Sequence, residues 1–230
     1  MNVKTFLLSA LILVFISGCS GTYLAYYQTL RIAFSEQKDV EMTLIEVHQS
    51  DIDVISVKRG NRPNAIMALA YIENGQNKWV SSDNAMLIIE KGRIIRTLGL
   101  NENLLYTSNT DLDPLKSLPY SHMTEGNLKS QTWSRVIDRS GDEYGHPLES
   151  NFNLGQVDNL QALNLNISTT LYIEIVSFRA PANYLQLNSS WKNQYWYAKN
   201  GELIKSIQQV SPLSESLEIT YLSRIARLNQ

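Results

Sequence analysis

Hydrophobic and polar positions alternate with a period of two along much of the chain. Residues 171–176 and 217–221 alternate in this way, and residues 52–57 show the mixed pattern of a partly buried strand. Two other runs, 65–72 and 85–89, are almost continuously apolar, which is typical of strands covered on both faces. These patterns predict a chain made mainly of β-strands.

Two dipeptides mark tight turns between such strands. Lys91-Gly92 separates residues 86–89 from 94–98, and Asn200-Gly201 separates residues 191–198 from 203–210. Glycine supplies the positive φ that a two-residue hairpin turn requires. Because no strand alternates with a long helical period, the predicted fold is all-β. We expect antiparallel meander sheets packed as a sandwich or a wrapped sheet, with a short N-terminal helix.

Helical spacing is confined to the N-terminal region. In residues 21–35, apolar and aromatic side chains recur at intervals of three and four, which places them on one helical face. This face either lies in a membrane interface or packs on the domain or on a partner barrel. A shorter helix is predicted near Thr43, because Thr43 and Glu46 have the spacing of a capping box.

The middle of the chain, residues 109–148, is less regular. Turn signals occur at residues 113–114, 118–119, 138–141 and 146–147. Between them, residues 132–137 are interpreted as a strand that holds Trp133.

The two predicted hairpins resemble each other. Gly92 and Gly201 are each followed by a polar residue, two aliphatic residues and a cation, and a tryptophan lies upstream of each glycine, Trp79 and Trp196. Either the domain consists of two similar halves, or amphipathic hairpins are simply alike.

The first eighteen residues are typical of a secretory signal peptide. Lys4 provides the positive start, and residues 6–16 form an apolar run that is too short to span a membrane as a helix. The run ends in Ile16-Ser17-Gly18-Cys19, and Cys19 is the single cysteine of the chain. Small residues before a cut site allow the chain to enter a peptidase in extended form.

This ending resembles the bacterial lipobox. The resemblance implies cleavage before Cys19, two acyl chains such as palmitate on its sulfur, and a third on the new amine. Three chains would anchor the protein firmly in a lipid bilayer. Residue Ser20, where an aspartate would favour the inner membrane, implies the outer membrane with the protein facing the periplasm. The predicted organisation is a signal peptide (1–18), a lipidated N-terminus and helix (19–35), and one β domain (36–230), as a single body or two similar halves.

The composition of the chain limits which kinds of partner and cross-link the protein can have. The 230 residues have a formal net charge of −2, so no basic field is available to hold nucleic acid. A single cysteine excludes a disulfide framework within one chain.

No catalytic residue, metal site or cofactor is predicted. The chain lacks a Gly-x-Ser-x-Gly nucleophile elbow, and His48, His122 and His146 are interpreted as surface or turn residues. Asp138, Asp142 and Glu143 surround a Ser-Gly turn, but they lack the regular spacing of a calcium loop.

Aromatic residues are concentrated on one predicted strand. Trp191, Tyr195 and Tyr197 lie on the same face together with Asn193. Such a surface suits the stacking of sugar rings, so these three rings are candidate glycan contacts. The alternative is that this face belongs to the core.

Several motifs of the chain can be considered together. They are the lipobox followed by residues 20–23, Lys78-Trp79-Val80-Ser81, the run 93–100, Asn103-Leu104, Tyr195-Trp196-Tyr197, and Lys205-Ser206-Ile207-Gln208. In combination they resemble the YjbF/GfcB family of lipoproteins, which is associated with group 4 capsule and exopolysaccharide operons. The resemblance implies an all-β outer-membrane lipoprotein made alongside a large outer-membrane β-barrel protein and periplasmic proteins of the same operon. It supplies no catalytic residues, only Cys19 as the lipid site.

The predicted function is a non-catalytic, membrane-tethered protein that assists export or assembly of a surface polysaccharide. It would dock on the barrel partner or contact the glycan. Two alternatives are an enzyme that modifies the exported glycan and a structural envelope lipoprotein with no glycan role.

Overall fold

The structure, a computed structural model, describes residues 39–117, 131–141, 143–178, 189–212 and 214–228. The strands are β1 (Val54–Arg59), β2 (Ala65–Glu73), β3 (Gln76–Ser81), β4 (Met86–Glu90), β5 (Arg93–Leu98), β6 (Leu104–Thr107), β7 (Gln131–Arg139), β8 (Glu143–Ala162), β9 (Leu165–Phe178), β10 (Ser189–Ala198), β11 (Leu203–Gln208) and β12 (Leu217–Thr220). The helices are α3 (Leu44–Gln49) and α5 (Leu222–Arg227), with the 3₁₀ turns η2 (Thr110–Leu112) and η3 (Pro114–Lys116).

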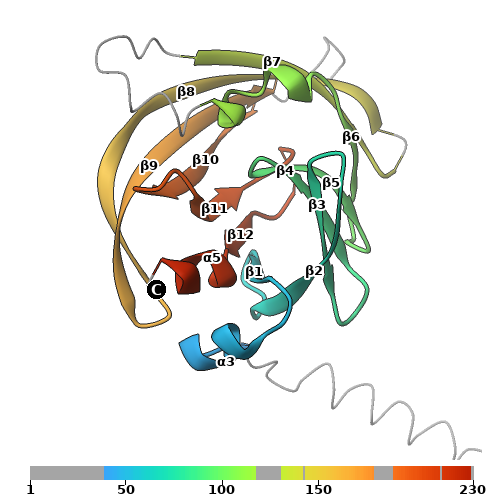
Figure 1. The fold of residues 1–230 in the computed structure, drawn as a ribbon. Coiled ribbons are helices and arrows are strands. Elements are labelled where there is room, and N and C mark those ends of the chain that lie inside the picture. The colour runs from blue at the N-terminus through green and yellow to red at the C-terminus, as the bar shows by residue number, and fades with distance from the viewer. Residues whose placement is uncertain (1–38, 118–130, 142, 179–188, 213, 229–230) are drawn as a thin grey trace, which may run out of the picture. The chain divides into compact units, whose positions relative to one another are not determined.

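The strands of this part of the chain form one antiparallel sheet of twelve strands. Its order is β5-β4-β3-β2-β1-β12-β11-β10-β9-β8-β7-β6, so two meanders, β1–β5 and β6–β12, meet where β1 pairs with β12. Figure 1 shows that the sheet curves into a ring, with the long strands β8 and β9 along one side. The prediction of an all-β antiparallel fold is confirmed, and of its two forms the wrapped sheet is the one observed.

The ring is closed at the junction of β5 and β6 by side chains. Within the described residues these two strands do not pair as a backbone ladder. The Leu104 amide instead donates to Thr97 Oγ1 at 2.9 Å, and Thr107 Oγ1 donates to the Ile95 carbonyl at 3.1 Å. Hydroxyl groups therefore satisfy backbone atoms that would otherwise be unpaired at two sheet edges.

The main core fills the inside of the ring. It includes Trp79, Trp133, Tyr172 and Tyr195, each at most 3% exposed. On β10 alternate residues point inward, so Tyr197 joins this core while its neighbour Trp196 packs on the outer face.

Two smaller clusters cover the outside of the ring. Ile225 of α5 packs with Trp196 and Ile204 in one of them. Val47 of α3 packs with Leu222 of α5 in the other. Both helices therefore shield the same outer region, where they also lie together in Figure 1.

The predicted short helix is confirmed at its N-terminus. Thr43 is the N-cap of α3, and its backbone amide donates to Glu46 Oε2 at 2.7 Å while the Glu46 amide donates to Thr43 Oγ1 at 3.3 Å. These reciprocal bonds complete the capping box.

Most predicted strands and turns are observed. Both hairpins form, with Gly92 and Gly201 at positive φ, and the predicted strand around Trp133 is β7. Of residues 138–141, only Ser140 and Gly141 form the turn between β7 and β8, because 138–139 are the last residues of β7. The proline at 147 lies inside β8 and not in a turn, so that prediction was wrong.

The apolar run 65–72 was predicted to be covered on both faces, and this was also wrong. It forms β2, but only Met67 in this strand is buried, and Ile72 is 63% exposed. Its distal half pairs only with β3, and there the Tyr71 ring is covered by Lys78, whose ammonium lies 4.6 Å from the ring centroid. A continuous apolar run thus identifies a strand but not what covers it.

Some predictions have no test in these residues. The helix at 21–35, the segment around Cys19 and the turn at 118–119 lie outside the described residues. The division into two similar halves also stays a prediction, although Trp79 points into the ring and Trp196 points out of it. The two similar hairpins do meet, because Gly92 packs directly against Leu203.

The contact between Gly92 and Leu203 gives a test of how the hairpins fit. A Cβ on Gly92 would lie 2.6 Å from Leu203 Cδ2, whereas a Cβ on Gly75 would meet nothing within 4 Å; both glycines have positive φ. Gly75→Ala should therefore lower the free energy of unfolding by about 1 kcal/mol, the cost of positive φ alone. Gly92→Ala should cost about 1–3 kcal/mol more through overpacking. Urea unfolding of both variants measures the difference, and equal losses would contradict the close packing.

Candidate functional site

A cluster of four buried charges lies inside the ring. Arg93 comes from β5, Asp113 from the N-cap of η3, Arg135 from β7 and Glu174 from β9. None of the four is more than 6% exposed, and Glu174 is completely buried. Two cations and two anions leave the cluster with no net charge, which is the condition under which burial of charges is tolerated.

Glu174 is the centre of the cluster. Its Oε2 accepts from Arg93 Nη1 at 2.6 Å, from Tyr195 Oη at 2.9 Å and from Asn193 Nδ2 at 3.0 Å. Its Oε1 accepts from Ser150 Oγ at 2.5 Å and lies 3.4 Å from Arg135 Nη1. Five donors on one carboxylate use its hydrogen-bonding capacity fully.

The two arginines are held in different ways. Arg93 binds Asp113 through Nε at 2.7 Å and Nη2 at 3.1 Å, which is a bidentate pair. Arg135 donates to Ser150 Oγ at 2.6 Å. The Trp133 ring makes a cation–π contact with both arginines, because its centroid lies 4.7 Å from Arg93 Cζ and 4.2 Å from Arg135 Cζ.

The pKa values follow from burial and from these partners. Burial alone would raise the pKa of Glu174, but attraction to Arg93 and Arg135 outweighs it and lowers the pKa to about 2. Burial lowers the pKa of Arg135 to about 10, which leaves this arginine charged at neutral pH. Burial has the same tendency at Arg93, but Asp113 and Glu174 overcome it and raise its pKa.

This cluster is suited to holding strands together and not to proton transfer. A general acid or base needs a pKa near the working pH and a reachable substrate. Glu174 has neither, because its pKa is far below neutrality and the cavity beside the cluster, lined by Arg93 and Arg135, holds only about 10 Å³. Such a volume accommodates about one water molecule.

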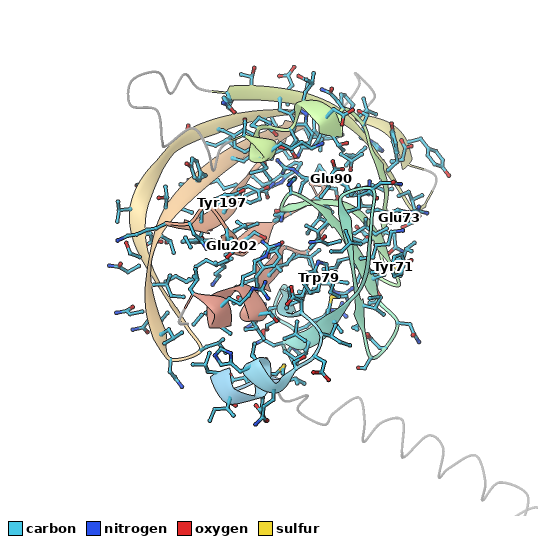
Figure 2. All side chains as sticks on the ribbon, in the orientation of Figure 1. Tyr71, Glu73, Trp79, Glu90, Tyr197 and Glu202 are labelled. Atoms are coloured by element: carbon cyan, nitrogen blue, oxygen red, sulfur yellow. The ribbon has the colours of Figure 1, made fainter. Side chains whose placement is uncertain are left out.

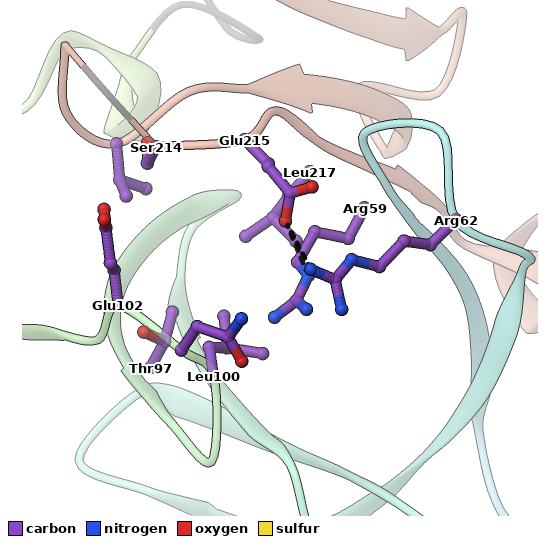
Figure 3. Close-up of a pocket in the computed structure, with 10 residues that line it drawn as sticks. Arg59, Arg62, Thr97, Leu100, Glu102, Ser214, Glu215 and Leu217 are labelled. Atoms are coloured by element: carbon purple, nitrogen blue, oxygen red, sulfur yellow. Dashed lines mark ion pairs between the residues drawn. The ribbon is translucent and has the colours of Figure 1, made fainter. Parts of the chain in front are cut away.

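Larger cavities open at the two ends of the ring. The first, of about 210 Å³, lies among the β1–β2, β5–β6 and β11–β12 connections. Figure 3 shows Arg59 and Arg62 reaching toward Glu215, with Glu102 on the other side. Arg59 Nε lies 3.0 Å from Glu215 Oε2, and Arg62 Nη2 lies 3.4 Å from the same oxygen, so the charges of this cavity largely neutralise each other.

The second cavity, of about 290 Å³, lies at the opposite end, among the β2–β3, β4–β5 and β10–β11 turns. Lys91, Lys116, Arg224, Glu202 and Asn77 are its charged and amide side chains, and buried Tyr197 also lines it. Figure 2 shows Tyr197 and Glu202 within the ring of strands, beside β10 and β11.

The three predicted glycan contacts have separate roles in the structure. Tyr195 is fully buried and its hydroxyl belongs to the charge cluster. Trp191 is 9% exposed and donates from Nε1 to the Gln209 carbonyl at 2.7 Å. Tyr197 is 4% exposed and lines the second cavity. All three rings thus lie in the core, as the alternative interpretation expected, and their contact with a glycan stays a prediction.

The other candidate residues are scattered. His48 is exposed on α3, and His146 lies on β8 with its ring 5.6 Å from that of Phe178. Asp138 accepts a hydrogen bond from the Gly145 amide. Cys19, His122, Asp142 and the side chain of Glu143 lie outside the described residues. In the parts of the chain that are described, no three His, Cys, Asp or Glu side chains gather to hold a metal ion, and no helix has the length and apolarity to cross a membrane.

The sequence analysis missed the charge cluster, although the strands carry a signal for it. Arg135 stands between Trp133 and Ile137 at a spacing of two, and Glu174 stands in the same way between Tyr172 and Val176. A charge at an inward position of one strand, matched by the opposite charge at an inward position of another, indicates a buried pair.

The pKa of Glu174 predicts how stability depends on acidity. Its ordinary value is 4.5 and its folded value about 2, so the folded state holds the proton less tightly than the unfolded chain. The stabilisation is complete above pH 4.5 and is lost as pH falls from there toward 2, by about 3 kcal/mol. Urea unfolding of the purified protein between pH 6 and pH 2.5 measures this loss.

Glu174→Gln should remove this acid-dependent share and cost about 3–5 kcal/mol at neutral pH, because two buried arginines lose their shared carboxylate. Asp111→Asn, at a side chain that is 98% exposed, is the matched control and should retain the full acid dependence. A Glu174→Gln variant as stable as the wild type would contradict the central role of Glu174, as would a wild-type protein whose stability is constant over this pH range.

Comparison with known proteins identifies the family. Residues 27–222 match the sequence profile described as "Group 4 capsule polysaccharide lipoprotein gfcB, YjbF". The "Uncharacterized lipoprotein GfcB" of Escherichia coli (strain K12) is 25% identical over 219 residues, which cover 94% of this chain and 97% of that protein. The "Uncharacterized lipoprotein YjbF" of the same organism is 24% identical over 204 residues, or 86% and 88% of the two chains.

A solved structure has the same fold. The crystal structure of the hypothetical lipoprotein YmcC from Escherichia coli (K12) superposes with a TM-score of 0.68 at 25% identity, covering 84% of this chain and 93% of that one. The match in sequence extends over most of the described residues. The chain therefore belongs to the YjbF family of group 4 capsule polysaccharide lipoproteins.

Proposed function

We propose that this lipoprotein is a non-catalytic accessory protein for export or assembly of a capsular polysaccharide or exopolysaccharide. Acyl chains on Cys19 would hold it in the outer membrane, facing the periplasm. There it would dock on an outer-membrane β-barrel protein or contact the emerging glycan, together with periplasmic proteins of the same operon. The family's description supports a role connected with the capsule.

The observation that supports a non-catalytic role is the saturation of the charge cluster. The pKa of Glu174 is lowered to about 2, and this shift makes the carboxylate a weaker base. All five of its donors belong to the protein itself. An enzyme that modified the glycan would need a carboxylate or another reactive group that faces a substrate. The names of the relatives indicate no catalytic activity either.

Tethering fits an accessory role for a physical reason. A protein held at a membrane meets partners in the same membrane at a high effective concentration, without any additional contact. A weak docking surface or a weak glycan site is then sufficient, whereas a free periplasmic protein would need a tighter one. The acyl anchor is thus part of the proposed mechanism.

Membrane fractionation tests the anchor. Wild-type protein is expected in the outer-membrane fraction, and Cys19→Ala is expected to leave it, because the acyl chains supply the membrane affinity. Ser20→Ala, which keeps the cysteine and adds no aspartate, is the control and should fractionate like the wild type. A Cys19→Ala protein that stays in the outer membrane would contradict the anchor.

The amount of surface polysaccharide tests the accessory role. A strain lacking this chain should lose most of its capsular polysaccharide, and the wild-type chain but not Cys19→Ala should restore it. An unchanged capsule in the deletion strain would contradict the proposed function. So would turnover of the isolated polysaccharide by the purified protein, since it would indicate an enzyme.

A further inference from the structure

The second cavity has an excess of positive charge. Lys91, Lys116 and Arg224 line it against one lining carboxylate, Glu202. Lys116 also forms an ion pair with Glu90, which does not line the cavity; Lys116 Nζ lies 2.6 Å from Glu90 Oε1. Counting that pair as neutral, two cations face one carboxylate, so the cavity favours an anion over a cation.

Lys91 and Arg224 are the two cations available to an anion, and they differ in how firmly they are held. Lys91 lies in the β4–β5 turn with a φ of +47°. Because this residue is exposed, its ammonium is available to a ligand. Arg224 of α5 donates through Nη1 to the Leu203 carbonyl at 2.8 Å, and its guanidinium lies over the Tyr221 ring at 4.1 Å. These two contacts fix the arginine in position, which reduces the entropy lost on binding.

The cavity also has groups that suit hydroxyls. Asn77 and Glu202 supply an amide and a carboxylate among the lining residues. Glu202 is already oriented, because its Oε2 accepts from Asn200 Nδ2 at 2.9 Å. A carboxylate with remaining lone pairs accepts hydrogen bonds from sugar hydroxyls, and an amide both donates and accepts.

An unpaired buried hydroxyl provides a second, independent observation. Tyr197 lines the cavity and is 4% exposed, and among the described residues its Oη has no hydrogen-bond partner. Buried polar atoms in native proteins are nearly always paired, so such a group requires an explanation. This oxygen lies beside the β4–β5 turn, 3.8 Å from the place where a Cβ on Gly92 would be.

We propose that the second cavity binds an acidic sugar unit of the polysaccharide, of the uronic acid class. The sugar carboxylate pairs with Lys91 and Arg224, and ring hydroxyls bond to Asn77 and Glu202. Tyr197 Oη, which lies beside the β4–β5 turn, gains its missing partner from a ring hydroxyl of the same unit. The cavity volume of about 290 Å³ is at the small end for ligand pockets, which fits one such unit and not a long segment. This inference rests on the proposed function, since it names the glycan chemistry that the protein would contact.

Isothermal titration calorimetry of the full-length lipidated protein in detergent tests the site. The probes are digalacturonic acid, the neutral disaccharide galactobiose and inorganic phosphate. We expect digalacturonic acid to bind at least tenfold more tightly than either of the others, and added salt to weaken it. Absence of digalacturonic acid binding would overturn the proposal. Equal binding of phosphate or of the neutral disaccharide would do so too, since the site would then select an anion or a sugar alone.

Four variants separate this cavity from other surfaces. Tyr197→Phe should weaken binding about three- to tenfold, the effect of one hydrogen bond, without lowering protein stability. Tyr221→Phe is the matched control, because Tyr221 Oη is also buried and without a hydrogen-bond partner among the described residues but does not line this cavity. Lys91→Asn, which tolerates positive φ, should reduce the preference for the acidic sugar. Lys192→Gln, at an exposed residue of β10, should not change it. Equal effects of Tyr197→Phe and Tyr221→Phe would overturn the site.

The capsule assay separates this inference from the function on which it rests. Suppose that the deletion strain loses its capsule, that Tyr197→Phe binds the acidic sugar as tightly as the wild type, and that this variant restores the capsule. The site is then wrong and the proposed function stands. If the variant loses binding but the deletion strain has a normal capsule, the site stands and the proposed role is wrong.

Discussion

The neutrality of the charge cluster is the condition on which the interior of this protein depends. Glu174 connects β9 to β5 through Arg93 and to β7 through Arg135, and Asp113 extends the link to η3. These elements are far apart in sequence, so each bond fixes how one part of the ring sits against another. Removal of one partner would leave an unpaired charge inside the core, where solvent compensates for it poorly. We regard the cluster as a device that specifies one closed arrangement of the sheet.

A second cross-link supports the same arrangement. Gln208 of β11 accepts from the Ile94 amide at 3.2 Å and donates to the Gly92 carbonyl at 2.8 Å. Its side chain thus bonds the backbone where the β4–β5 turn enters β5, the terminal strand of the sheet. Residues 92–94 thus combine three contacts in one short segment. Gly92 packs against Leu203, Gly92 and Ile94 bond to Gln208, and Arg93 belongs to the buried charge cluster.

The sequence was sufficient for the type of fold and for many elements, but not for the site. Glycine turns and period-two patterns are local signals, so the hairpins at 91–92 and 200–201 and the capping box at Thr43 could be predicted. Which face of a strand lies inside is not local. On β9, Tyr172, Glu174 and Val176 are buried inside the ring, while the more uniformly aliphatic Leu171, Ile173 and Ile175 face outward. Residue types alone would have favoured the reverse. The twenty-residue strand β8 was missed for a related reason, since its polar residues form a strand because β7 and β9 pair with it on either side. Pro147, which has no amide to donate, pairs only with Val136 of β7 among the described residues.

The closure between β5 and β6 has a consequence for how the molecule moves. Every other junction in the ring is a backbone ladder, whereas this one is held by the hydroxyls of Thr97 and Thr107 and by packing. Local opening is easiest where the fewest backbone bonds must break together. We therefore expect local opening of the ring to begin between β5 and β6. Such opening would reach the buried charge of Arg93 on β5 before it disturbs the strands on the opposite side of the ring.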